Sequence, residues 1–238
     1  MFLDVNRVRK SFGGLVAIND LDLHVDEGEV IGLIGPNGSG KTTLFNLISG
    51  VLKPESGEIK FIERDITGLK PHKVCQAGIA RTFQLTKPFV HMTVLDNVMI
   101  GRLYGSDPIL NIREAKEECE RVLEFIGLDD KMQMKAATLG VVDRKRLEIA
   151  RALATKPKLL LLDEMMSGLT PTEMEEALEL VKAIGDSGGT LIVVEHVMKA
   201  ILSIASRLVV LNYGEKIAEG EPEEVVNDEK VIEAYLGE

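Results

Sequence analysis

Long apolar runs are missing from this sequence of 238 residues. The longest uninterrupted ones, such as Leu159 to Leu162, have four residues. A helix that crosses a bilayer needs about 20 apolar residues, so we expect no membrane-spanning segment. The opening residues, MFLDVNRVRK, mix charged with apolar side chains and do not have the pattern of a signal peptide. We therefore expect a chain that stays in the cytosol.

Cysteine is scarce, and repeats and low-complexity segments are absent. The two cysteines, Cys75 and Cys119, have no neighbouring Cys or His at the spacing of a zinc site. We expect both to be buried, reduced thiols, with Cys119 on the apolar side of a helix.

Basic residues are outnumbered, with 28 Lys and Arg against 38 Asp and Glu, which gives a net charge of −10. Much of the negative charge lies in Glu215 to Glu238, which we interpret as a solvated acidic tail. An acidic chain is repelled by the phosphates of nucleic acid, so we expect no nucleic-acid partner. The 45% apolar and 28% charged residues are ordinary for a globular core.

Strand and helix patterns alternate at both ends of the chain, and a helical block lies between them. Strands are predicted at 21–25, 30–34, 58–62, 159–162, 190–194 and 208–211. Helices are predicted at 43–49 with Gly50 as the stop, from the Thr93 and Asp96 capping box onward, along one face of 112–126, at 144–154 and at 174–184. This order predicts an α/β domain with an inserted helical subdomain.

The strongest motif is the glycine-rich loop between the strand at 30–34 and the helix after it. It fits the pattern G-x-x-x-x-G-K-[ST], in which glycines let backbone N–H groups surround phosphate oxygens and the lysine contacts the β- and γ-phosphates. The start of the helix adds positive potential. The hydroxyl of Thr42 can bind Mg²⁺. The predicted nucleotide-binding residues of this loop are Gly35, Pro36, Asn37, Gly38, Ser39, Gly40, Lys41, Thr42 and Thr43.

The second motif is a pair of acids, Asp163 and Glu164, directly after four leucines. A buried strand that ends in Asp places the carboxylate at the edge of the sheet where phosphates bind. We predict that Asp163 holds Mg²⁺ and that Glu164 is the general base that activates the attacking water. Without the glycine-rich loop, an ordinary acidic turn would explain this pair better.

The third motif is Leu147-Glu148-Ile149-Ala150-Arg151-Ala152-Leu153, followed by Pro157 and the strand that ends at Asp163. With it, the whole chain resembles an ATP-binding-cassette (ABC) ATPase, the nucleotide-binding subunit of an ABC transporter. The segments at 80–84, 91–98 and 228–238 resemble the ATPases of branched-chain amino acid importers most closely. The resemblance implies one ABC ATPase domain over 1–238, with a phosphate-loop NTPase core (1–84 and 155–238, a mixed sheet with flanking helices) and a helical signature subdomain (85–154).

The resemblance also assigns single residues. Gln84 matches the glutamine that senses the metal and the γ-phosphate and couples to the membrane subunit. His196 matches the histidine that contacts the γ-phosphate. Phe12 matches the aromatic that stacks on adenine, although a core phenylalanine explains it equally well. Ser167 to Thr170 matches the loop that crosses a dimer interface.

One segment departs from the family pattern. The signature leucine-serine-glycine-glycine-glutamine falls on Leu139-Gly140-Val141-Val142-Asp143, which lacks the serine and replaces both glycines by valine. In the family this segment completes the ATP site of the opposite subunit. We therefore expect a heterodimer with a second ABC ATPase whose signature is intact, in which the partner's ATP is held or hydrolysed less well. A smaller departure is Met165, where many members have proline.

The resemblance implies a subunit that binds ATP and Mg²⁺ and drives transmembrane permease subunits from the cytoplasmic face of the membrane. The transported solute stays open between amino acids, urea and other small polar molecules, and lipid export by a related cassette is a further alternative. A small-molecule kinase would need an acceptor site and lid arginines, and a GTPase would need an Asn-Lys-x-Asp motif, which is absent. A non-transport ABC ATPase that acts on nucleic acid or ribosomes usually carries two cassettes or long coiled-coil inserts. This acidic sequence has a single cassette, which disfavours that alternative.

Overall fold

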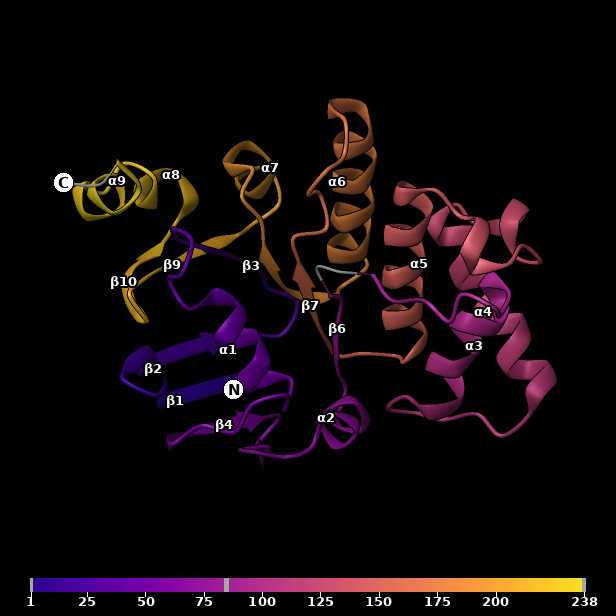
Figure 1. Cartoon of the computed structure of the whole chain (residues 1–238), viewed down its shortest axis with the longest axis horizontal. Helices are drawn as coiled ribbons and strands as arrows, with labels where there is room; N and C mark the ends of the chain where they lie inside the picture. Colours follow the sequence, from indigo (N-terminus) through magenta and orange to yellow (C-terminus); the bar gives the residue numbers. More distant parts are fainter. Residues whose placement is uncertain (1, 84–85, 237–238) are drawn as a thin grey trace.

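The computed structural model describes residues 2–83 and 86–236, which form two β-sheets with flanking helices (Figure 1). The strands are β1 (Leu3–Phe12), β2 (Leu15–Val25), β3 (Val30–Ile34), β4 (Ser56–Phe61), β5 (Arg64–Asp65), β6 (Ile79–Arg81), β7 (Leu159–Asp163), β8 (Thr190–Val194), β9 (Arg207–Asn212) and β10 (Glu215–Gly220). The helices are α1 (Lys41–Ile48), α2 (Pro71–Ala77), α3 (Val94–Tyr104), α4 (Ile112–Ile126), α5 (Val141–Ala154), α6 (Pro171–Asp186), α7 (Met198–Leu202), α8 (Pro222–Val225) and α9 (Glu229–Leu236), with short 3-10 turns at Asp129–Lys131 and Ala136–Thr138.

The larger sheet has the strand order β10-β9-β3-β8-β7-β6 within the described residues. Its strands run parallel except β10, which forms an antiparallel hairpin with β9, so the sheet is mixed as predicted. Both faces are buried, because alternate leucines of β7 enter different cores: Leu160 and Leu162 in one, Leu159 and Leu161 in the other. A strand covered on both sides explains the continuous apolar runs in the sequence.

The first strands form a second, antiparallel sheet, which the sequence analysis did not separate from the first. Its order in the described chain is β2-β1-β4-β5. Gly13 and Gly14 are the only residues between β1 and β2, and so short a loop forces the two strands to pair with each other as a hairpin. Side chains of this sheet, of α1 and of one face of the larger sheet share a single core, which positions α1 between the two sheets (Figure 1).

Helices α3, α4 and α5 pack on one another at the end of the molecule beyond β6 (Figure 1). The predicted capping box at the start of α3 is present, because Thr93 and Asp96 each bond the other's backbone N–H. The predicted apolar face of α4 is buried at Ala115, Cys119, Leu123 and Ile126, but Ile112 is exposed because it begins the helix. The predicted boundaries of the subdomain at 85–154 enclose these helices and stay a prediction.

The boundaries of single elements differ from the predicted ones by a few residues. Helix α5 begins at Val141, three residues before the predicted Arg144, and Gly140 precedes its first turn without a side-chain cap. Cys119 is buried, whereas Cys75 is half-buried and not buried as expected, since α2 lies at the surface.

Candidate nucleotide-binding and catalytic site

The loop Gly35–Thr43 runs from the end of β3 into the start of α1. Gly35, Gly38 and Gly40 have φ of 147°, 81° and 109°, a region that side chains with a Cβ disfavour. A Cβ on Gly35 would lie 2.1 Å from the carbonyl oxygen of Leu211, and one on Gly40 would lie 2.7 Å from a carbonyl oxygen of β2. The loop is thus wedged against two strands in a shape that requires glycine.

The ammonium group of Lys41 is turned back into this loop. Its Nζ donates hydrogen bonds to the carbonyl oxygens of Gly35 (2.7 Å) and Pro36 (3.0 Å). Burial lowers the pKa of Lys41, and the carboxylates of Glu164 and Asp163 oppose that shift. A cation is therefore held where terminal phosphates can replace the two carbonyl oxygens.

The start of α1 is open to an anionic ligand. The helix has no acidic residue in its first turn and no side-chain cap, so its first N–H groups lack a competing side-chain acceptor. Asn37 and Thr42 are exposed, Thr43 is half-buried, and Ser39 is buried. Lys41 is itself the first residue of α1, so the positive end of the helix lies beside its ammonium-bearing side chain.

The predicted acids end β7, two strands away from β3 in the larger sheet. Asp163 is buried, and Glu164 follows it in a left-handed backbone conformation with φ of 50°. This turn directs Glu164 toward β8, so that its Oε1 lies 2.9 Å from Nε2 of His196. The structure thereby brings together the predicted base and the predicted γ-phosphate ligand, although 32 residues separate them along the chain.

A pocket of about 300 Å³ joins these parts. The loop from Asn37 to Thr43 forms one wall, and Glu164 and His196 close the other. Phe12 lies at the rim with nearly half of its surface exposed, where an aromatic ring can stack on a base, so it is not a core residue. Tyr213, in the β9–β10 turn, lines the same pocket, and the sequence analysis missed it because an Asn-Tyr-Gly turn has no chemical signature.

The donor chemistry of the site fits a magnesium ion that arrives with a nucleotide. No cluster of three or more His, Cys, Asp and Glu able to hold a metal ion occurs in the described part of the chain. Mg²⁺ prefers oxygen ligands and usually keeps waters and phosphate oxygens rather than an all-protein cage. The exposed Thr42 hydroxyl and the Asp163 carboxylate supply oxygen ligands of that kind. Gln84, the third predicted metal ligand, lies outside the described residues.

Two charged residues hold the turn after Glu164, a contact that the sequence analysis predicted for neither of them. The buried carboxylate of Glu195 accepts a hydrogen bond from the backbone N–H of Met166 at 2.7 Å. Lys145 of α5 donates to the carbonyl oxygen of Met165 at 3.0 Å. Burial raises the pKa of Glu195 and lowers that of Lys145. Both contacts depend on distant segments meeting, so no local pattern could have found them.

The degenerate signature segment lies at the start of α5. Val141 is exposed at the first helical position, and Gly140 has open space around it. The carboxylate of Asp143 is 2.9 Å from Nζ of Lys131, so its negative charge is paired within the chain.

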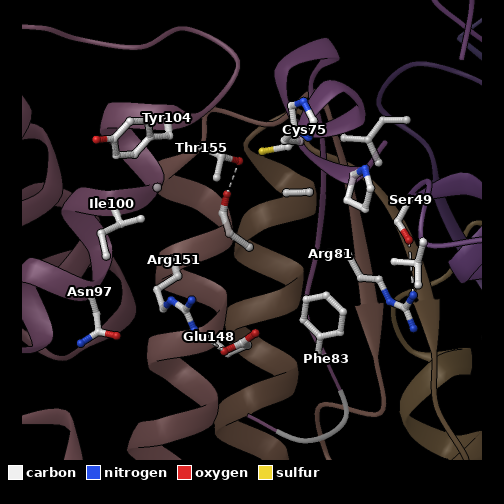
Figure 2. A pocket seen from close by; sticks show the side chains of 17 residues that line it. Ser49, Cys75, Arg81, Phe83, Asn97, Ile100, Tyr104, Glu148, Arg151 and Thr155 are labelled. Atoms are coloured by element: carbon white, nitrogen blue, oxygen red, sulfur yellow. Dashed lines mark hydrogen bonds and ion pairs between the residues drawn. The ribbon is translucent and has the colours of Figure 1, made fainter. Parts of the chain in front are cut away.

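A second pocket, of about 360 Å³, lies between the helical block and the strand β6 (Figure 2). In Figure 2, Arg81 and Phe83 stand on one side of it, and Ile100, Tyr104 and Arg151 on the other. Phe83 directly precedes the segment that contains Gln84.

A glycine-rich loop between a parallel strand and a helix, with two acids and a histidine at the ends of neighbouring strands, defines a phosphate-loop nucleotide hydrolase. Comparison with known families narrows this class. Residues 18–167 match the family described as ABC transporter, and residues 215–238 match the one described as branched-chain amino acid ATP-binding cassette transporter. The chain belongs to the ABC transporter family and is an ABC ATPase, as its motifs indicated.

Individual relatives are similar over the whole length. The high-affinity branched-chain amino acid transport ATP-binding protein LivG of Salmonella typhimurium is 40% identical, and the alignment covers 99% of this chain and 98% of LivG. The ADP conformation of the ATP-binding cassette MJ1267 has a TM-score of 0.89 at 35% identity, covering 100% of this chain and 99% of that one. The dimeric cassette MJ0796, in a post-hydrolysis state bound to ADP and Pi, has a TM-score of 0.83 at 25% identity, covering 93% and 99%.

No helix in the described ranges is both long and apolar enough to cross a membrane.

Proposed function

We propose that this chain is the ATP-binding and ATP-hydrolysing subunit of an importer of branched-chain amino acids. The observation that carries the ATPase part is the shared pocket of the phosphate loop, Glu164 and His196. The match of residues 215–238 and the full-length similarity to LivG support the transported solute.

In this proposal separate groups of the site bind the phosphates, the adenine and the metal. Lys41 and the amides of Gly38 to Thr43 bind the β- and γ-phosphates, and Phe12 stacks on adenine. Thr42 and Asp163, together with Gln84, would hold Mg²⁺, and the ion would neutralise charge that develops on the phosphates.

Hydrolysis needs a base beside the γ-phosphate. Glu164 accepts a proton from the water that attacks phosphorus, as the bond to the leaving ADP oxygen breaks. His196, 2.9 Å from Glu164, orients that carboxylate and contacts the γ-phosphate.

The partner in this proposal is a second ABC ATPase with an intact signature. The dimeric MJ0796 cassette supports a paired assembly. Here the segment 139–143 offers Val141 and Val142 where glycine lets backbone approach phosphate. The partner's signature would then complete the ATP site of this chain. The partner's own ATP site would be completed by the segment 139–143, which would bind the phosphates more weakly.

The membrane permease would contact the helical subdomain, which we propose spans 85–154, at the second pocket beside Phe83. The lining of this pocket is more apolar than polar, and it includes residues of α3 and α5 as well as residues of the core. We propose that the core comprises residues 1–84 and 155–238. That contact would place the chain on the cytoplasmic face of the membrane.

The test of the ATPase part measures phosphate release and MgATP binding by calorimetry. We expect wild-type protein to bind MgATP and Lys41→Ala to lose binding by at least about tenfold, since it removes the ammonium that meets the phosphates. Thermal unfolding checks that the variant is folded. Equal affinities for wild type and variant would contradict the assignment.

The test of the solute uses vesicles that contain this chain with its permease, its partner ATPase and a binding protein. Uptake of radiolabelled leucine, isoleucine or valine that depends on ATP is expected. Uptake of urea instead, or export of lipid, would overturn the solute while leaving the ATPase assignment in place.

A further inference from the structure

Arg81, the last residue of β6, extends its side chain between the proposed metal-binding edge of the sheet and the second pocket. Its side chain is 6% exposed, and Nη2 lies 2.7 Å from Oδ2 of Asp163, whose side chain is 4% exposed. Nη1 donates to Oδ1 of Asn46 at 2.6 Å and lies 3.4 Å from Oγ of Ser49, both on or next to α1. The guanidinium therefore connects the helix of the phosphate loop to the carboxylate that ends β7.

These contacts fix the direction of the Asp163 carboxylate. A planar guanidinium presents several donors at fixed angles, so it can hold Oδ2 while also bonding α1, and leaves Oδ1 for another ligand. The backbone of Asp163 is held too, because its N–H donates to Oγ1 of Thr82 at 3.1 Å. A carboxylate buried to this degree is costly without a paired charge, and Arg81 supplies that charge.

The same guanidinium is covered by two aromatic rings. Its central carbon lies 5.5 Å from the ring centroid of Phe45, in the core, and 5.2 Å from that of Phe83. Phe83 is about half exposed and lines the second pocket together with Arg81 (Figure 2). Among the described residues, the buried Nε of Arg81 has no hydrogen-bond partner, so on this side the Phe83 and Phe45 rings contact the guanidinium without a competing hydrogen bond.

We propose that Arg81 is a positioning residue that orients Asp163 for the magnesium-nucleotide complex and makes that orientation depend on the Phe83 ring in the second pocket. A permease segment that moves Phe83 would then alter the metal site without touching nucleotide. This inference rests on the proposed role of Asp163 as a metal ligand.

The test compares the dissociation constant of the non-hydrolysable analogue AMP-PNP in EDTA with that in saturating Mg²⁺, by calorimetry. The ratio of the two constants isolates the contribution of the metal. Arg81→Lys keeps the positive charge but loses the planar set of donors. We expect it to reduce this ratio by about tenfold, because losing a residue that orients a metal ligand usually costs about that much. The constant in EDTA should change little.

Phe83→Leu tests the connection to the pocket. It keeps an apolar side chain and removes the ring, so we expect the metal-dependent ratio to fall by about threefold, as for a lost cation–π contact. Arg102→Lys is the matched control. Arg102 is also buried, paired with Glu118 at 2.7 Å, but lies in α3 away from the nucleotide pocket, so its ratio should equal that of wild type.

Three results would overturn the proposal. An unchanged ratio in Arg81→Lys removes its role in positioning Asp163. An unchanged ratio in Phe83→Leu, with a reduced one in Arg81→Lys, removes the connection to the pocket. If wild-type protein binds AMP-PNP equally well in EDTA and in Mg²⁺, the metal assignment in the proposed function is refuted, and this inference with it.

Discussion

Glu164 shows how a single backbone conformation prepares a catalytic side chain. Its φ of 50° is uncommon for a residue with a Cβ and persists only where surrounding contacts hold it. Its N–H donates to the carbonyl oxygen of Val194 at 2.9 Å, and Lys145 and Glu195 hold the next two residues. The strained turn places Glu164 beside His196 instead of letting it continue along the strand.

At this scale the chemistry of Glu164 can be tested with an isosteric change. Glu164→Gln keeps the shape and can still bond His196, but an amide cannot accept a proton from water. We expect the rate of phosphate release to fall by about 100-fold or more, as for loss of a general base, while affinity for MgATP changes little. Phosphate release and calorimetry measure the two quantities. Turnover close to that of wild type would remove Glu164 as the base.

Helix α5 shows how one element connects several parts of the molecule. Its first turn carries the degenerate signature, Lys145 reaches the turn after Glu164, and Glu148 and Arg151 form an ion pair of 3.0 Å beside the second pocket. Another such connection is made by α9, where the hydroxyl of Tyr235 accepts a hydrogen bond of 2.8 Å from the N–H of Gly35. The C-terminal segment is thereby bonded to the base of the phosphate loop.

The ion pair of α5 predicts a pH effect on stability. Burial raises the pKa of Glu148 above its ordinary value of 4.5, and Arg151 only partly opposes this. Since the folded state keeps this proton to higher pH than the unfolded state, Glu148 contributes stability below pH 4.5 that is lost as pH rises through the folded pKa.

The glutamine of the Glu148→Gln variant does not titrate, so the variant does not lose this stability as pH rises. The free energy of unfolding of the variant minus that of wild type should therefore increase from about pH 4 to pH 7. Urea unfolding at several pH values measures it, with Glu176→Gln, an exposed carboxyl paired with Arg146, as control. A difference that stays constant with pH would show that burial does not dominate at Glu148.

For the whole molecule, the central question is the symmetry of the assembly. Asp143 is paired with Lys131, so its negative charge is partly offset. The serine and the two glycines of the signature are still absent, and this pairing does not replace them. The chain alone should then form poor ATP-bound pairs with itself.

The prediction is tested by restoring the signature with Gly140→Ser, Val141→Gly, Val142→Gly and Asp143→Gln together. We expect ATPase turnover of the purified chain alone to rise by at least about tenfold, since donors to the γ-phosphate are regained. Steady-state rates measure it, and thermal unfolding checks the cost of glycine in the first turn of α5. The unmodified chain alone could instead hydrolyse ATP as fast as its mixture with the partner ATPase. That result would contradict the prediction that the two ATP sites differ.

The sequence by itself determined the parts whose chemistry is local. A phosphate loop needs glycines, a lysine and a helix start within nine consecutive residues, and a buried strand ending in acids is equally contiguous, so Gly35–Thr43, Asp163 and Glu164 could be located without coordinates. The alternation of strands and helices gave the α/β class and the helical block for the same reason.

Only the tertiary structure decided which distant segments meet. Residues far apart along the chain are joined by the pairing of β1 with β4, the contact of Glu164 with His196, the bond of Arg81 to Asp163 and the position of Tyr213 at the pocket. Such contacts are set by how two cores pack against opposite faces of one sheet, and packing leaves no periodic pattern at the residues that it brings together.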